Sequence, residues 1–246
     1  MSDNFEALRS LLPRFAEGIG VTLQLSIGGM ILAFLIATSL GLAVRVPNTI
    51  VRGIARTVIE VFRGTSLLVQ LFLFFYVAPV LFPGLFRGDV YLTGLVTGIL
   101  ALGLNYGAYG ADVVRGAIEA VPRGQWEASV ALSLSPRRRL FRIIWPQAWA
   151  IMIPSLANLG IMLIKGTAVS YVILMHDITF FSNMLRQRTN DTFFSFGFGM
   201  LIYLVIALLL VLVATIAESR AKHRLGDESR LRRLFRLRPA SAKVGV

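Results

Sequence analysis

One lysine of this sequence lies inside a long apolar stretch, where charged side chains are rare. Lys165 belongs to the run 148–174, which contains no other charged residue. Charged groups at such positions are costly and usually face a protein interior or a water-filled cavity. The ammonium group of Lys165 can bind the carboxylate of a ligand or pair with a neighbouring acid. Alternatively, it lies near a membrane surface and reaches water along its flexible stem.

Four further polar side chains interrupt apolar stretches of the chain. A carboxamide or phenol in such a place either lines a polar pathway or forms a hydrogen bond between two helices. The four residues are Gln70, Asn105, Tyr106 and Asn158.

Several kinds of chemistry are excluded by what the sequence lacks. It has no cysteine, so disulfides, thiolate catalysis and cysteine metal sites are not available. The histidines, His176 and His223, are too far apart in sequence for a metal-ligand motif. The order of Lys165-Gly166-Thr167 does not match the phosphate-binding motif G-x-x-x-x-G-K-[S/T]. We therefore expect no metal site and no ATP site in this chain.

The elements that must position these residues are long apolar segments. The 246-residue chain is 56% hydrophobic and 15% charged, with a mean hydropathy of +0.71. A membrane-spanning helix needs about 20 apolar residues, and continuous apolar runs favour helices because strands of membrane barrels alternate apolar with polar residues. We predict an all-α, polytopic membrane protein with five transmembrane helices, at 19–44, 58–82, 91–111, 148–174 and 196–217.

The positive charges predict how the chain is oriented. Lys and Arg collect in the cytoplasmic segments of inner-membrane proteins. Residues 45–63 carry four of them, residues 112–147 carry six and the tail carries nine, against five on the other side. This asymmetry predicts a periplasmic N-terminal segment at 1–18, a membrane domain at 19–218 and a basic cytoplasmic tail at 219–246. It also accounts for the net charge of +12 without nucleic-acid binding.

The third predicted span carries small residues at intervals of four. Gly94 and Gly98 form one pair, and Gly103 and Gly107 form a second. Such a stripe lets another helix approach closely. It predicts either a tight helix contact or ordinary packing within the subunit.

The segment 112–147, between the third and fourth spans, is too polar to cross a membrane. Residues 125–134 favour a helix, Ser135 and Pro136 break it, and a second short helix should run toward Ile144. The segment is then a helix–turn–helix hairpin on the cytoplasmic face. It either lies on lipid headgroups as a basic amphipathic hairpin or docks a soluble partner and transmits motion to the spans.

Motifs in and around this hairpin carry a resemblance to a known family. Glu127-Ala128-Ser129, with Ser133 at the position of a glycine, resembles the cytoplasmic E-A-A…G signature of permease subunits in ATP-binding-cassette importers. Pro146-Gln147-Ala148 resembles the P-Q-A that closes the signature. Arg63-Gly64-Thr65 and the run 67–70 resemble the start of the second span in the polar amino-acid branch, and matching residues extend from Thr22 to Arg220. Serine replaces the glycine at 133, so we expect Ser135 and Pro136 to shape the turn more than a left-handed residue does.

The resemblance implies partners and roles. The ATP and Mg²⁺ would be bound by two separate ATPase subunits, a periplasmic solute-binding protein would deliver the substrate, and a second permease, a sibling chain or a copy of this one, would complete the pathway. The hairpin would dock on the ATPase, with Glu127 fixing it there; the alternatives for Glu127 are a solvated charge or a local partner for an arginine. The docking residues would be Gly124, Glu127, Ala128, Ser129, Ser133, Pro136 and Pro146. The five polar residues inside spans would be the candidates for the translocation pathway.

Within this branch, the sequence is similar to the importers of ectoine and hydroxyectoine. The similarity lies in the runs 107–118 and 62–66 and in the stretch that begins at Asp177. Gly166 and Ala168 depart from the residues usual in the amino-acid importers. The resemblance implies import of a small polar or zwitterionic solute, an amino acid or an ectoine-like compatible solute, across the bacterial inner membrane.

Two other functions are weighed against this one. A stand-alone secondary transporter or channel would usually have more spans and inverted repeats, and it would have no use for the hairpin. An intramembrane enzyme would need a constellation such as Ser-His or paired aspartates within the spans. Asp112 and Asp177 lie at span edges on opposite predicted faces, so we predict that the chain is not an enzyme.

Overall fold

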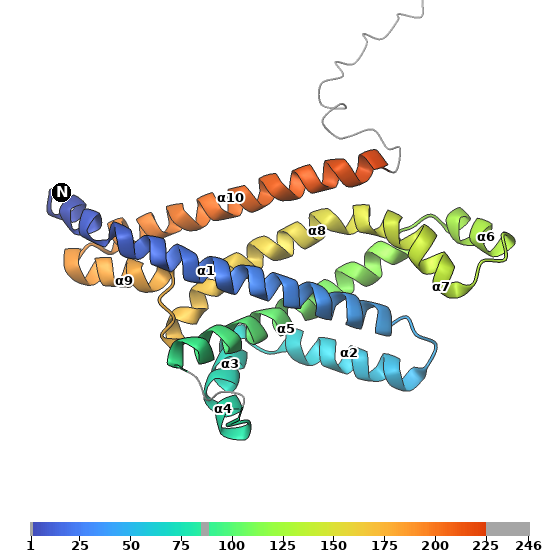
Figure 1. Ribbon diagram of the computed structural model, residues 1–246, viewed down its shortest axis with the longest axis horizontal. Helices are drawn as coiled ribbons and strands as arrows, with labels where there is room; N and C mark the ends of the chain where they lie inside the picture. The colour runs from blue at the N-terminus through green and yellow to red at the C-terminus, as the bar shows by residue number, and fades with distance from the viewer. Residues whose placement is uncertain (1, 85–88, 225–246) are drawn as a thin grey trace, which may run out of the picture.

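The computed structural model describes residues 2–84 and 89–224, and this part of the chain is helical throughout, with short turns (Figure 1). Four long helices, α1, α5, α8 and α10, run along the long axis of the molecule. Shorter helices connect them. The helices are α1 (Ser2–Ala43), α2 (Thr49–Gly64), α3 (Leu67–Phe72), α4 (Ala78–Leu81), α5 (Val90–Glu119), α6 (Arg123–Ala131), α7 (Pro136–Arg139), α8 (Trp145–Gly166), α9 (Ile178–Thr189) and α10 (Thr192–Arg224). Between them lie two π-helical turns, η1 (Leu73–Val77) and η2 (Leu140–Ile144), and a 3₁₀ segment, η3 (Thr167–Ile173).

Four helical segments are long and apolar enough to cross a membrane, and a bent pair makes up to five. They cover the predicted spans at 19–44, 91–111, 148–174 and 196–217 to within one residue, so the all-helical class and these four spans are confirmed. Their exposed surfaces are rich in large apolar side chains, and α10 exposes Met200, Leu204, Leu208 and Leu212. Such a surface suits lipid or a partner chain rather than water.

The predicted span at 58–82 is wrong as a single helix. The chain turns by 102° between Thr49–Gly64 and Leu67–Leu81. Thr65 and Ser66 adopt extended backbone angles at this break. α2 therefore lies alongside the long helices, whereas α3, η1 and α4 project away from them (Figure 1).

Long helices run across three further predicted boundaries. α1 begins at Ser2, so 2–18 is the start of the first long helix; Leu11 and Phe15 of this part pack on α9. α5 continues to Glu119, and α8 begins at Trp145, so the predicted hairpin segment 112–147 shares both ends with long helices. Of the predicted tail, 219–224 continues α10, and 225–246 lies outside the described residues.

The core forms where α1 packs along α5. Side chains of α1 enter at the glycines of α5: a Cβ atom added to Gly98 would lie 2.7 Å from Leu25, and one added to Gly103 would lie 2.6 Å from Leu32. The glycine stripe therefore marks a tight contact, and the contact lies within the subunit. Ala101 and Leu102 of the same helix are fully buried beside it.

Replacing Gly107 with alanine is expected to lower the free energy of unfolding by about 1–3 kcal/mol, the usual cost of an added group in a packed core. Its Cβ atom would lie 2.8 Å from the Cβ of Ile36 and 3.1 Å from the carbonyl oxygen of Ala33. The matched control is Gly116→Ala in the same helix, where nothing lies within 4 Å and alanine favours the helix. Thermal unfolding of the purified protein would show a lower midpoint for Gly107→Ala alone; equal midpoints would contradict the tight contact.

Candidate functional site

The segment singled out by its motifs folds as a helix, a tight turn and a second helix. α6 spans Arg123–Ala131, and α7 begins at Pro136 and continues through η2 into α8. Pro136 occupies the first turn of α7 and Ser135 its N-cap position, as predicted, although the Ser135 side chain makes no capping hydrogen bond. Figure 1 shows this hairpin at one end of the molecule and α9 at the opposite end.

The turn of the hairpin is made by Ser133, contrary to the expectation that Ser135 and Pro136 shape it. Ser133 has a φ of 52°, in the left-handed region. Its N–H donates to the carbonyl of Val130 at 2.8 Å, and the N–H of Leu134 donates to that of Ser129 at 3.2 Å. These two bonds are the pattern of a Schellman C-cap, in which glycine is the usual left-handed residue. Ser133 therefore adopts the backbone conformation that glycine would provide.

The two faces of α6 have different surroundings. Ser129 is buried, and its hydroxyl donates to the carbonyl of Trp126 at 2.6 Å, so its polar group is satisfied within its own helix. Glu127, Ala128 and Gly124 are exposed. In the described part of the chain Glu127 makes no ion pair, so an arginine partner within these residues is not observed.

The exposed side of the hairpin also carries apolar side chains. Val130, Leu132 and Phe141 are 53%, 70% and 57% exposed. Ser133, Pro136 and Pro146 are exposed as well. Exposed apolar side chains gathered on one surface mark a site of contact with a protein or a membrane.

Contacts with the long helices hold the hairpin in place. Trp126 packs on the buried cluster formed by α5, η2 and α8, and the guanidinium of Arg45 lies 5.6 Å from its ring centre. Arg45 also pairs with Glu119 at 3.5 Å. The carboxamide of Gln147 on α8 donates to Gln125 on α6 at 3.3 Å. A hairpin held by these contacts can transmit a movement to α5 and α8.

Two of the candidate pathway residues hold the bend between α2 and α3. Gln70 is buried, and its amide donates to the carbonyl of Phe62 at 2.8 Å and to the hydroxyl of Thr65 at 2.7 Å. Asn105 of α5 donates to the same Phe62 carbonyl at 3.0 Å. Because the helix is broken there, this carbonyl would otherwise lack a donor. Both side chains therefore make the helix-to-helix hydrogen bonds that were the alternative to a pathway role.

The other two candidates without a charge, Tyr106 and Asn158, lie on α5 and α8. The phenol of Tyr106 donates to the carbonyl of Met162 at 2.9 Å, which joins α5 to α8. Asn158 is exposed on α8. The structure thus brings Gln70 and Asn105 together at the carbonyl of Phe62.

Lys165 lines a cavity of about 590 Å³ between α8, α9 and α10. Its polar neighbours in the wall are the hydroxyls of Thr179, Ser182 and Tyr203; the remaining lining is Ile161, Phe196, Gly199, Met200, Leu204 and Ala207. Lys165 itself is exposed. A cavity with one cation, three hydroxyls and apolar walls can hold a small solute that carries a carboxylate.

A buried acid lies behind this cavity, and the sequence reasoning missed its role. Asp177 caps α9, with one carboxylate oxygen accepting from the N–H of Phe180 at 2.8 Å and the other from the phenol of Tyr203 at 3.1 Å. Burial raises the pKa of Asp177 to about 6, although these hydrogen bonds oppose the shift. An aspartate just before a helical stretch that ends in Arg186 and Arg188 was the available signal for α9 and its N-cap.

A row of ion pairs, also missed, connects α2 to α5. Asp112 pairs with Arg63 and, at 3.3 Å, with Arg115, which in turn pairs with Glu119 at 3.3 Å. Tyr109 donates to the carbonyl of Arg63 at 3.3 Å. Residues 63 and 112 are 49 positions apart, so only the fold could bring them together. No cluster of three metal-ligating side chains occurs within 2–84 and 89–224.

Comparison with known families identifies the family to which this fold belongs. Residues 29–223 match the family described as "Binding-protein-dependent transport system inner membrane component". The chain belongs to this family. It is a multi-pass permease component of an ATP-binding-cassette (ABC) transporter in the inner membrane. ABC permeases of this kind work in importers with a partner permease, an ATPase and a substrate-binding protein and are not catalytic on their own.

Relatives from several bacteria agree with the family assignment. A probable amino-acid ABC transporter permease of Sinorhizobium fredii is 40% identical over 82% of this permease and 85% of its own length. The L-cystine transport system permease protein TcyB of Bacillus subtilis is 34% identical over 86% and 88%. The glutamate/aspartate import permease protein GltJ of Escherichia coli is 30% identical over 84% and 86%.

Solved structures show the same fold. One chain of an amino acid ABC transporter crystallised with histidines superposes with a TM-score of 0.76 at 29% identity, covering 88% of this permease and 98% of that chain. A chain of the MetNI methionine transporter gives 0.73 at 16% identity, covering 86% and 98%, and supports the fold alone.

Proposed function

We propose that this permease imports a small zwitterionic solute that carries a carboxylate, in the class of amino acids and ectoine-like compatible solutes. The observation that carries the proposal is the cavity between α8, α9 and α10, which is lined by Lys165 together with Thr179, Ser182 and Tyr203. A cation in a largely apolar wall favours a small anionic group over an uncharged solute. The amino-acid substrates named for its relatives support the same class.

The energy for import comes, in this proposal, from ATP and Mg²⁺ bound by two separate ATPase subunits. The hairpin of α6 and α7 docks on one of them from the cytoplasmic side, as the distribution of Lys and Arg predicts. Its exposed Glu127 and apolar side chains support this role. A periplasmic solute-binding protein delivers the substrate, and a sibling permease or a second copy completes the pathway.

Among zwitterions, ectoine and hydroxyectoine are one specific choice, supported by the sequence similarity around 62–66, 107–118 and Asp177. In the structure, the first two runs contribute to the bend and to the ion pairs of Asp112, and only the third borders the cavity. The cavity wall therefore supports the wider class, zwitterions with a carboxylate, more directly than it supports ectoine.

Uptake measurements in cells with and without the gene for this permease test the proposal. Labelled ectoine and a panel of amino acids are supplied, together with analogues in which the carboxylate is an amide. We expect uptake of at least one zwitterion to disappear with the permease and to be poorly competed by its amide. Loss of ectoine uptake would identify the specific substrate. A substrate without a carboxylate that is imported equally well would contradict the role of Lys165, and uptake independent of ATP would instead favour a stand-alone transporter.

A further inference from the structure

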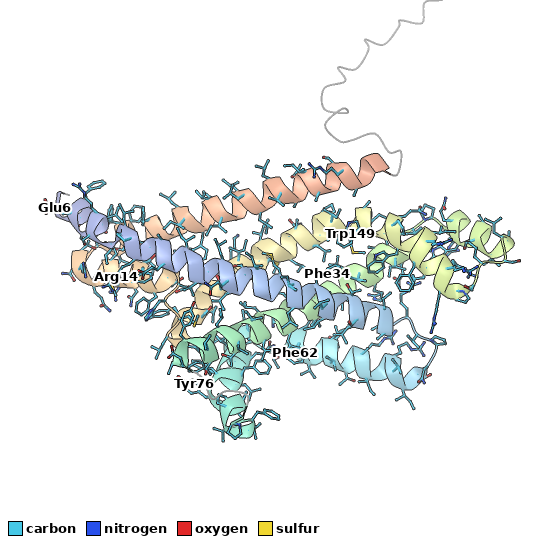
Figure 2. The ribbon with its side chains drawn as sticks, in the orientation of Figure 1. Glu6, Arg14, Phe34, Phe62, Tyr76 and Trp149 are labelled. Atoms are coloured by element: carbon cyan, nitrogen blue, oxygen red, sulfur yellow. The ribbon has the colours of Figure 1, made fainter. Side chains whose placement is uncertain are left out.

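Two neighbouring cavities on the side of the molecule away from α2 are formed by the same three helices. The first, of about 190 Å³, lies between α1, α8 and α10 against α5. The second, of about 640 Å³, is formed by α1, α8 and the end of α10. Phe34 of α1 lines both of them. Its ring contacts Trp149 of α8 edge to face, with ring centres 5.5 Å apart, and both residues are labelled in Figure 2.

The two cavities differ in chemistry: the first has an apolar lining, as acyl chains require, and the second has tryptophans and a cation, which suit a lipid headgroup. The first is lined by aliphatic and aromatic side chains and glycines, with Tyr106 as its polar member, whose hydroxyl is already bonded to Met162. The second holds two tryptophans, Trp145 and Trp149, and one charged group, Arg220. Tryptophan is the residue typical of the boundary between hydrocarbon and headgroups.

The distance between the two cavities along α10 also corresponds to the thickness of one membrane leaflet. Leu210 lines the first cavity and Arg220 the second, ten residues later on α10. Ten helical residues extend about 15 Å, which is half of the roughly 30 Å hydrocarbon core, or one leaflet. Arg220 also lies at the end of the membrane-spanning segment Thr192–Ala221, at the depth where a headgroup would be.

We propose that this groove of α1, α8 and α10 binds an anionic phospholipid, with its phosphate at Arg220 and one acyl chain against Phe34 and Leu156. Within the described residues the Arg220 side chain makes no ion pair or hydrogen bond, so its charge is available. Basic pockets between spanning helices at the membrane surface suit anionic headgroups. The segment 225–246 of the same chain is a poorer occupant, because it carries six Lys or Arg against two Asp or Glu and would repel Arg220.

The test is native mass spectrometry of the complete transporter, purified in detergent and titrated with two phospholipids. The lipids are phosphatidylglycerol and phosphatidylcholine with identical acyl chains. We expect phosphatidylglycerol to bind about fivefold more tightly, the effect of one basic residue near a membrane surface. Arg220→Gln should remove this preference, whereas Arg56→Gln, which changes an exposed arginine of α2 outside the groove, should leave it intact.

A second variant tests the acyl-chain part. Leu156→Trp fills the first cavity and should weaken the binding of both lipids while the preference for phosphatidylglycerol persists; the thermal midpoint of this variant shows that it is folded. Equal affinity of the wild type for the two lipids would overturn the proposal, as would an equal effect of Arg220→Gln and Arg56→Gln. A preference that appears only after deletion of 225–246 would also overturn it, since the tail would then be the occupant. None of these outcomes depends on the transported substrate.

Discussion

Changing Glu127 to arginine is expected to reduce ATP-driven uptake by this permease at least tenfold while the protein remains in the membrane. Glu127 is exposed on α6 beside the apolar side chains of Val130 and Leu132, and in the described part of the chain it has no ion-pair partner. If the ATPase covers this surface, the carboxylate becomes part of a buried interface. Removing one member of an interfacial charge pair typically costs about 2–5 kcal/mol, and reversal of its charge adds repulsion.

The measurement has two parts, because uptake alone does not separate docking from folding. Co-purification of the ATPase with the permease should fall by about 30-fold or more for Glu127→Arg, in line with the cost of an unpaired interfacial charge. The neutral variant Glu127→Gln should have a smaller effect. Glu17→Arg is the matched control, since Glu17 is an exposed residue of α1, a helix whose N-terminal end lies away from the hairpin (Figure 1). Normal uptake by Glu127→Arg, with the permease present in the membrane at its usual amount, would contradict both the docking role and the cytoplasmic position of the hairpin.

The hydropathy pattern predicted the long helices well, because a membrane-spanning helix must have a minimum length and an apolar composition. It could not predict the bend between α2 and α3, where apolar residues continue on both sides. The local signal was Gly64 followed by Ser66, a residue type favoured at helix N-caps. Of the donors that stabilise the bend, Gln70 lies in the first turn of α3 and Asn105 comes from α5. The contribution of Asn105 therefore depends on the fold and not on the local sequence.

α9 was missed for a different reason. Its twelve residues are too short and too polar to span a membrane, so a search for apolar runs does not find it. The ends of the helix are nevertheless encoded locally: Asp177 accepts from the N–H of Phe180, and Asn190 ends the helix with a φ of 53°. Sequence motifs identified the hairpin, but the left-handed conformation of Ser133 could not be expected, because serine takes it less readily than glycine.

The candidate pathway residues show what a sequence can say about polar groups inside a membrane. All five were chosen because they interrupt apolar runs, and four of them are uncharged. Three of these four satisfy backbone carbonyls of other helices or of a broken helix. A lysine differs, because its charge needs a countercharge or water as well as acceptors. Lys165 is accordingly the candidate that lines a cavity large enough for a solute.

Changing Lys165 to methionine is expected to raise the KM for uptake of the zwitterionic substrate about tenfold or more, with a smaller change in the maximal rate. Methionine keeps an unbranched side chain of similar length but removes the charge from the wall of the cavity. A hydrogen bond to a charged group contributes about 1.5–3 kcal/mol. A tenfold rise in KM corresponds to about the lower end of that range. If the substrate carboxylate binds Lys165 as proposed, the loss should appear mainly in apparent affinity.

Three comparisons distinguish this role from a structural one. Lys165→Arg retains the charge and should recover most of the apparent affinity, whereas Ser155→Ala, which removes an exposed polar group from the same helix, should have little effect. The amide analogue of the substrate, which has no carboxylate, should be a poor competitor for the wild type and should discriminate little between the wild type and Lys165→Met. If Lys165→Met instead lowers the maximal rate at unchanged KM, the ammonium group does not bind the substrate. Its position at the end of α8, next to η3, would then assign it to the movement of these helices.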